Sequence, residues 1–295
     1  MSRFRRFRGG KRHRHEPRPD RIPVRAIFPN LITATAACAG VTSIALSSEG
    51  RFLPALLALV VACICDGTDG AVARLLGVSS KLGAELDSLA DFVNFGVAPA
   101  MLMFFWLTGK WFGNSEPVMA ATQVRIVLAC ALYYAMCDCF RLARFNTMLE
   151  QETAPYWKHF FTGVPAPGGC WMVLTPVILA LALDAKGSYP AVAAFLQNPW
   201  TGVFMLLFVG SLMASRLPTI SLKHMHIPRR WMPAVLAALL LLVAFLVSNF
   251  WMTIGVVGVG YILTVPLTGL IFLKVRGRFE QMAGAPALDA GPSKV

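Results

Sequence analysis

Long apolar segments dominate this chain, recurring from Ile27 to about Lys274 with short polar stretches between them. A helix that crosses a membrane needs about 20 predominantly apolar residues. The pattern therefore predicts an all-α, polytopic integral membrane protein with about eight transmembrane helices, the last two separated only at Ser248-Asn249. The predicted spans are 27–48, 53–76, 84–108, 123–146, 165–184, 198–214, 231–250 and 251–274.

Composition agrees with a membrane protein. Of the 295 residues, 56% are hydrophobic and 14% are charged, whereas soluble proteins carry about 25% charged residues. The mean hydropathy is +0.61. We divide the chain into a basic cytoplasmic tail (1–26), a membrane core (27–230), two additional C-terminal membrane helices (231–274) and a flexible cytoplasmic tail (275–295).

The net charge of +12 is concentrated at one side of the predicted bundle. With an even number of spans both termini lie on the same side, where the tail 1–26 holds ten Lys or Arg. Outside that tail, thirteen Lys or Arg fall on this side and four on the other. Because cytoplasmic loops are enriched in Lys and Arg, both termini are predicted to be cytoplasmic. Membrane topology accounts for the charge, so a nucleic-acid partner is not expected.

Four aspartates interrupt the apolar pattern: Asp66, Asp69, Asp87 and Asp91 fall inside the second and third predicted spans. An ionised carboxylate in hydrocarbon is costly unless it is paired, hydrated or bound to a metal. Carboxylates gathered together also repel one another. A divalent cation is their natural partner, and metal-assisted phosphate chemistry is the function this favours.

Helical spacing brings these acids to one place. The second span must continue to about Leu76, where Gly77 is typical of a helix end. The connection 77–83 is short, so the third span returns antiparallel beside it. Asp66 and Asp69 then share a face of one helix, and residues 87 and 91 share a face of the next.

Small residues accompany the acids. Gly70 and Ala73 lie on the same face as Asp69 and leave room for a ligand, while Arg74 at its edge offers a planar fork for phosphate oxygens. On the third span, the acidic face continues at Asn94.

Two other interpretations of these four aspartates compete with a catalytic metal site. A purely structural polar network does not offset the free-energy cost of burying ionised carboxylates without partners. A divalent metal transporter needs acids spread through the membrane depth, and none of these spans carries one at its far end. Transport remains an alternative that an assay can test.

The spacing of these acidic and small residues also resembles the signature of a known protein family. Asp66-x-x-Asp69-Gly70-x-x-Ala73-Arg74, eight further residues, and Gly83-x-x-x-Asp87-x-x-x-Asp91 resemble the signature of the CDP-alcohol phosphotransferase family. The resemblance implies a core of six membrane helices, often in a homodimer, with divalent metal at the motif. Members transfer a phosphatidyl-type group from a CDP-linked donor to an alcohol and release CMP.

Longer strings resemble the serine-accepting members of this family; they are residues 86–99, 141–146, 161–167 and 29–33. The resemblance implies CDP-diacylglycerol as donor, L-serine as acceptor and a bacterial inner (plasma) membrane as location, among membrane lipids. Glycerol 3-phosphate, inositol phosphate and choline remain alternative acceptors. Asn94 stands where Ser is expected, and Asp138, one turn before Arg141, is also unexpected.

Roles for individual residues follow from the resemblance. Metal, as two Mg²⁺ or Mn²⁺ ions, would be held by Asp66, Asp69 and Asp87, with Asp91 bordering the ions as a further ligand and as the base that takes the acceptor's proton. The residues expected at the CDP-lipid are Asn30, Thr33, Gly70, Ala73, Arg74 and Gly83. Arg141 and Arg144 are expected to bind the acceptor or a phosphate.

Overall fold

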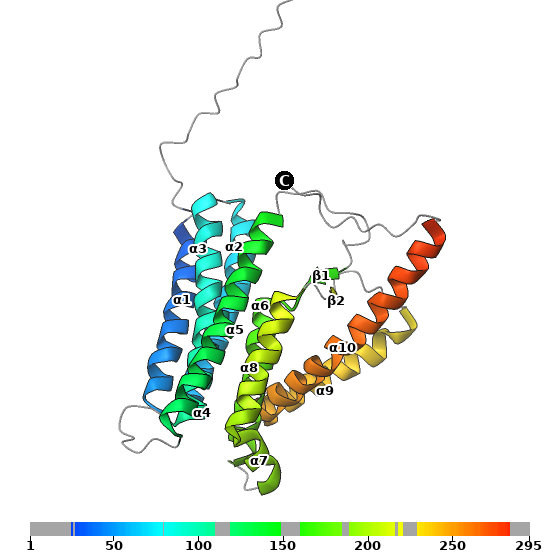
Figure 1. The fold of residues 1–295 in the computed structure, drawn as a ribbon. Coiled ribbons are helices and arrows are strands. Elements are labelled where there is room, and N and C mark those ends of the chain that lie inside the picture. Colours follow the sequence, from blue (N-terminus) through cyan, green and yellow to red (C-terminus); the bar gives the residue numbers. More distant parts are fainter. Residues whose placement is uncertain are drawn as a thin grey trace, which may run out of the picture.

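A computed structural model describes residues 25, 27–78, 80–109, 119–148, 160–184, 189–215, 218–220 and 229–283. Within these ranges the chain is almost entirely helical, with most helices side by side in one bundle (Figure 1), so the predicted all-α class is confirmed. The basic tail, apart from Arg25, and residues 284–295 lie outside the described ranges.

The described elements are named here in the order in which they follow one another along the chain. The helices are α1 (Ile27–Ser48), α2 (Phe52–Leu76), α3 (Lys81–Asp91), the π-helix η2 (Phe92–Val97), α4 (Ala98–Thr108), α5 (Ala121–Met148), α6 (Ala166–Asp184), α7 (Pro190–Gln197), α8 (Pro199–Ala214), the 3₁₀ turn η5 (Arg229–Trp231), α9 (Met232–Ser248) and α10 (Phe250–Ala283). Two three-residue strands, β1 (Phe160–Thr162) and β2 (Pro218–Ile220), pair antiparallel.

Among the described residues, five helical segments are long and apolar enough to cross a membrane, as expected for a polytopic membrane protein. They are Ile27–Ser48, Phe52–Leu76, Lys81–Thr108, Ala121–Thr147 and Ala166–Leu183. The apolar helices Pro199–Ala214, Met232–Ser248 and Phe250–Val265 are shorter. All eight coincide with predicted spans, while the number that cross the membrane stays a prediction.

Helix ends follow local chemistry. α2 ends at Leu76 and Gly77 adopts the left-handed conformation (φ 62°), as predicted. α3 begins at Lys81, three residues before the predicted start, because the Ser80 side chain accepts a hydrogen bond from the Gly83 N–H (2.9 Å). α10 continues beyond the predicted end at 274 through residues 275–283, and the short α7 was not predicted.

The first helix holds the site together, because α1 packs against α2, α3, η2 and α4. Its buried face is made of small residues, among them Ala36, Gly40 and Ser43. A Cβ on Gly40 would stand 2.2 Å from the Asn94 side-chain oxygen, so glycine permits the close approach of α1 and η2.

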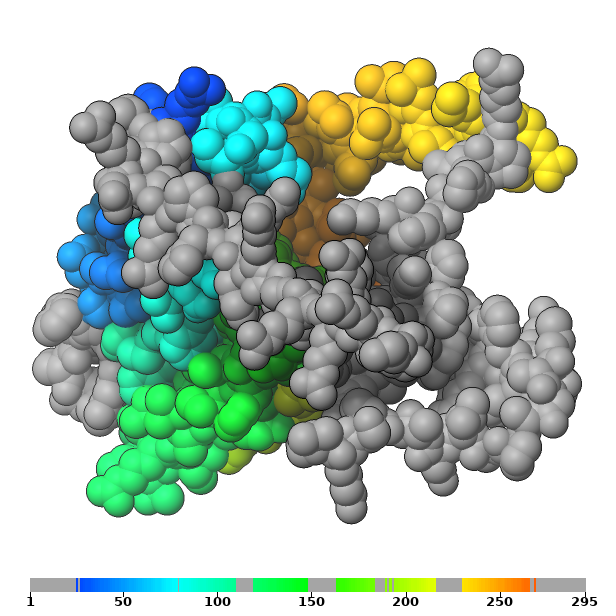
Figure 2. Space-filling view, turned by 90° about the horizontal axis from the view of Figure 1, so that it is seen from above, coloured from blue at the N-terminus to red at the C-terminus, as the bar shows by residue number. Residues whose placement is uncertain are grey.

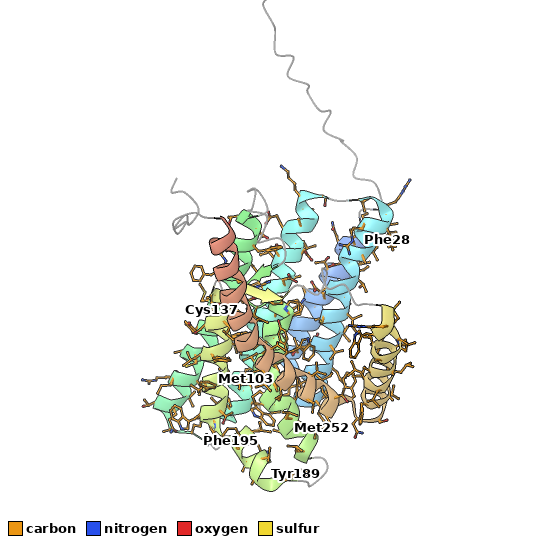
Figure 3. All side chains as sticks on the ribbon, turned by 90° about the vertical axis from the view of Figure 1, so that its right-hand side faces the viewer. Phe28, Met103, Cys137, Tyr189, Phe195 and Met252 are labelled. Carbon is orange, nitrogen blue, oxygen red and sulfur yellow. The ribbon has the colours of Figure 1, made fainter. Side chains whose placement is uncertain are left out.

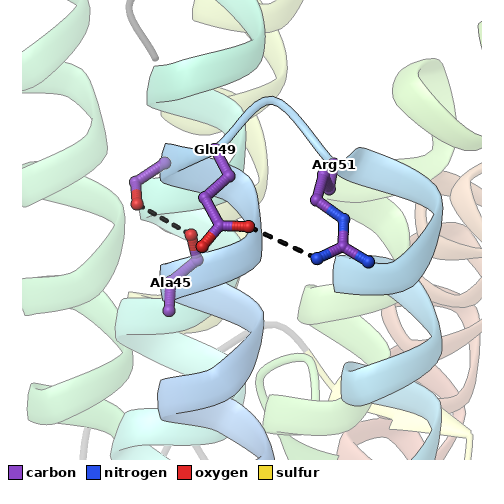
Figure 4. Close-up of polar contacts among 4 residues, drawn as sticks. Ala45, Glu49 and Arg51 are labelled. Carbon is purple, nitrogen blue, oxygen red and sulfur yellow. Dashed lines mark hydrogen bonds and ion pairs between the residues drawn. The ribbon is translucent and has the colours of Figure 1, made fainter. Parts of the chain in front are cut away.

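A tight connection sets α2 antiparallel to α1 (Figure 4). The Ser48 hydroxyl donates a hydrogen bond to the Ala45 carbonyl (2.7 Å), and Arg51 lies 3.4 Å from Glu49. That ion pair is exposed, so it adds little stability.

The apolar core lies between α4, α5, α6 and α8, where Met103, Tyr134, Leu174 and Leu206 are fully buried. Figure 3 shows Met103 inside the bundle, with Phe28 toward one end and Tyr189 toward the other. In contrast, α9 and α10 slant away from the bundle (Figure 1), and α9 contacts mainly α10.

Candidate active site

Three carboxylates from two helices converge in the described chain. Asp66 and Asp69 come from α2 and Asp87 comes from α3, and one oxygen of each lies within 4.8 Å of the others. Asp69 is buried, with 4% of its surface exposed, and the other two are half-buried. A hard divalent cation such as Mg²⁺ or Mn²⁺ prefers such oxygen ligands, so this donor set fits the predicted metal.

Asp69 is fixed by hydrogen bonds. It accepts one from the Thr33 hydroxyl of α1 (2.6 Å) and one from the backbone N–H of Gly70. The Thr33 hydroxyl also lies 3.1 Å from the Pro29 carbonyl. The sequence predicts Thr33 near the nucleotide, and the structure adds its contact with one of the three converging carboxylates.

A pocket with a volume of about 170 Å³ opens beside Asp69 and Asp87, at the end of the bundle where α1 begins and α2 ends. Seen from that end, the first residues of α1 and the beginning of α3 lie side by side (Figure 2). The lining residues are Pro29, Asn30, Thr33, Asp69, Gly70, Ala73, Val78, Ser80, Gly83, Ala84 and Asp87. All the predicted CDP-lipid residues except Arg74 are among them.

The packing around the pocket explains why residue 83 of the motif is glycine. A Cβ on Gly83 would stand 2.9 Å from the Asn30 side-chain oxygen, so glycine preserves the approach of α3 to α1. Arg74 is exposed, at the edge of the face that carries Gly70, as the helical spacing predicts.

Asp91 lies one helical turn beyond Asp87 and outside the group of three converging oxygens. Its carboxylate interacts electrostatically with Asp66 and Asp87. One of its oxygens is buried and has no hydrogen-bond partner among the described residues. Its roles as metal ligand and base remain predictions.

The π-helix η2 begins directly after Asp91, and such wide turns are frequent at functional sites. The carbonyl of Phe95, inside the turn, accepts a hydrogen bond from the buried Tyr134 hydroxyl (3.0 Å). Asn94 packs against Gly40 of α1. Residues 92–97 are wound more widely than the α-helix that the spacing predicted for them.

The two arginines of α5 differ in their surroundings. Arg141 is largely buried, with 15% of its side chain exposed, and one guanidinium nitrogen is 4.0 Å from Asp138. Arg144 donates hydrogen bonds to the carbonyls of Ala214 and Ser215 (3.1 Å each). It therefore caps the C-terminus of α8, a structural contact that local sequence could not indicate.

The comparisons with known proteins agree with this site. The profile of the CDP-alcohol phosphatidyltransferase family matches residues 26–204, and the chain belongs to that family. It is therefore a membrane enzyme of phospholipid biosynthesis, and the predicted family is confirmed.

Similar relatives share one name, CDP-diacylglycerol–serine O-phosphatidyltransferase. The relative from Mycobacterium leprae (strain TN) is 35% identical over 251 residues, covering 85% of this chain and 77% of its own. The relative from Helicobacter pylori (strain J99) is 36% identical over 191 residues, 65% of this chain and 70% of its own. That from Bacillus subtilis (strain 168) is 37% identical over 133 residues, 43% and 65% of the two chains.

Proposed function

We propose that this chain is a phosphatidylserine synthase, which transfers the phosphatidyl group of CDP-diacylglycerol to the hydroxyl of L-serine and releases CMP. The observation that carries the proposal is the convergence of Asp66, Asp69 and Asp87 beside a pocket lined by the residues expected at the CDP-lipid. The name shared by the similar relatives supports serine as the acceptor.

The donor's nucleotide occupies the pocket between α1, α2 and α3. Asn30 and Gly83 line one side of it, and Gly70 and Ala73 present little bulk to the phosphates on the other. Arg74, beside Gly70, binds phosphate oxygens with its planar guanidinium. The acyl chains stay in the lipid, which explains why the reaction is carried out within a membrane bundle.

In the reaction, the serine oxygen forms a bond to the phosphorus that carries diacylglycerol, and the bond from that phosphorus to CMP breaks. Asp91 takes the proton from the serine hydroxyl, a contribution typically of about 100- to 10,000-fold. Asp66, Asp69 and Asp87 would hold two Mg²⁺ or Mn²⁺ ions with Asp91 at their border. When bound, the ions supply positive charge that neutralises the pyrophosphate and the departing CMP.

Further parts of the proposal concern location. The distribution of Lys and Arg supports a cytoplasmic site and cytoplasmic termini in a bacterial inner membrane. A homodimer is proposed by analogy with the family. The domain division into 1–26, 27–230, 231–274 and 275–295 is retained as a proposal.

The test is CMP release by the purified full-length protein in vesicles containing CDP-diacylglycerol and Mg²⁺ or Mn²⁺. Release with L-serine, and its loss on EDTA treatment with recovery on adding metal back, is the expected result. Asp87→Asn should abolish release, whereas Glu85→Gln, an exposed acid on the same helix, should leave it unchanged.

Different outcomes would redirect the assignment. Release only with glycerol 3-phosphate, inositol phosphate or choline would select another acceptor. Metal flux across the vesicle without CMP release would favour a transporter. Full activity in EDTA would refute the metal-dependent mechanism.

A further inference from the structure

Asp138 of α5 takes no part in the mechanism above, yet its environment is unusual. The residue is 0% exposed, and neither carboxylate oxygen has a hydrogen-bond partner among the described residues. A buried carboxylate without such partners is strongly destabilising unless another group compensates it. Its nearest described cation is Arg141, at 4.0 Å, which is an ion pair without a hydrogen bond.

The position of Asp138 is defined by the wide turn of η2. One of its oxygens lies over Gly96, where a Cβ would stand only 2.7 Å away. The absence of a side chain at residue 96 therefore makes the space that the carboxylate occupies. Asp138 and Arg141 are three residues apart, so both lie on the same face of α5.

This pair also interacts with the proposed base. Asp91, the proposed base, interacts electrostatically with both Asp138 and Arg141. Asp91 ends α3 directly before η2, and α5, which carries Asp138 and Arg141, packs against η2. The side chain of Asn146 donates a hydrogen bond to Ser88 (3.0 Å) and joins the same two helices one turn nearer their ends.

We infer that Asp138 and Arg141 bind the ammonium and carboxylate groups of an amino-acid acceptor, with the acceptor's hydroxyl directed to Asp91; this rests on the proposed function. An ammonium group has three donors for the orphaned carboxylate oxygens. A carboxylate matches the planar fork of arginine. A zwitterion therefore supplies hydrogen-bond donors to the Asp138 oxygens, which have none among the described residues, and a carboxylate for the Arg141 guanidinium.

The inference makes Asp138 a specificity-determining residue. An alcohol without an ammonium group leaves the Asp138 carboxylate buried and unpaired. Sites built to hydrogen-bond a substrate group reject analogues that lack it by about 10,000- to 100,000-fold. A purely structural role, in which Asp138 only orients Arg141, predicts no such dependence on the ammonium group.

The experiment compares three acceptors in the CMP-release assay: L-serine, 3-hydroxypropionate, which lacks the ammonium group, and ethanolamine, which lacks the carboxylate. The wild-type protein is expected to prefer L-serine over each analogue by about 10,000-fold or more in kcat/KM, the range for sites that reject an analogue lacking a hydrogen-bonding group. Asp138→Asn is expected to raise the KM for serine at least about tenfold, consistent with loss of one charged hydrogen bond.

The two substitutions are expected to change acceptor preference in different ways. Asp138→Asn should reduce the preference for serine over 3-hydroxypropionate while the KM for CDP-diacylglycerol stays within about twofold of wild type. Arg141→Gln should instead reduce the preference for serine over ethanolamine. Glu85→Gln, an acid-to-amide change at an exposed position, should alter neither preference.

The outcomes separate the two proposals. A wild-type protein that accepts 3-hydroxypropionate as well as serine overturns the inference without any variant, even if Asp138→Asn fails to fold. A folded Asp138→Asn protein that weakens both acceptors equally, or neither, also overturns it. A wild-type protein that releases CMP with a different alcohol and not with serine refutes the proposed function and this inference together.

Discussion

The hydrogen bond from Thr33 to Asp69 leads to the sharpest test of how this site holds metal. Thr33 is buried on α1, and its hydroxyl lies 2.6 Å from an oxygen of Asp69 on α2. Thr33→Val keeps the shape of the side chain but removes the donor. The Asp69 carboxylate then loses a partner that fixes its direction, although the charge that would bind the cation remains.

The magnitude follows from the chemistry of that bond. A hydrogen bond to a charged group contributes about 1.5–3 kcal/mol, and about 1.4 kcal/mol corresponds to a factor of ten. Removing partners that orient metal ligands typically weakens metal binding about 10- to 100-fold. We therefore expect Thr33→Val to raise the Mg²⁺ or Mn²⁺ concentration for half-maximal activity about 10- to 100-fold, with activity largely recovered at saturating metal.

The assay measures CMP release against metal concentration at saturating CDP-diacylglycerol and serine. Thr33→Ser, which retains the hydroxyl, should resemble wild type. Thr35→Val is the matched control, because Thr35 lies on the same helix with its hydroxyl exposed and bonded to the Leu31 carbonyl (2.8 Å). Superimposable metal curves for the two valine variants would refute the reasoning, and a raised KM for CDP-diacylglycerol at saturating metal would assign Thr33 to the nucleotide.

Three other substitutions test separate parts of the structure. Asp91→Asn should retain binding of CDP-diacylglycerol but lower turnover about 100- to 10,000-fold, because the proposed base is lost; near-normal turnover would exclude that role. Arg144→Ala should lower the free energy of unfolding by about 1–3 kcal/mol as the α8 carbonyls lose their donors, measured by thermal unfolding in detergent. If the serine KM rises with no loss of stability, Arg144 belongs to the acceptor site instead. Gly40→Ala places a Cβ against Asn94 and should destabilise the protein by about 1–3 kcal/mol, whereas Gly260→Ala, with open space around it, should not; equal effects of the two would show that the α1–η2 approach is unimportant.

The parts of the site that depend on backbone geometry alone could be predicted from the sequence. Spacing of three or four residues was enough to place Asp66 and Asp69 on one face of α2. The cost of burying charge then required Asp87 to face them across the connection. The break at Asn249 between α9 and α10 was likewise predicted, from the polar residues between two apolar runs.

The remaining features depend on contacts that local sequence does not encode. Thr33 and Asp69 are 36 residues apart, and Arg144 and Ser215 are 71 apart. The segment 92–97 is apolar at most positions, so its pattern does not distinguish a π-helix from an α-helix. The wide turn and the contact of Asn94 with Gly40 of α1 could therefore not be predicted.

The outlying helix α9 has a consequence for the enzyme's dependence on its surroundings. Every residue from 231 to 248 is exposed in the isolated chain, so we expect hydrocarbon tails to cover the helix on most sides. Its 17 residues are about 26 Å long, slightly less than the roughly 30 Å hydrocarbon layer of a typical bilayer. Thermal stability in vesicles should therefore vary with acyl-chain length and peak in thinner bilayers; a flat response would contradict this. Variation in bilayer thickness would then act directly on an enzyme that supplies lipid to that same bilayer.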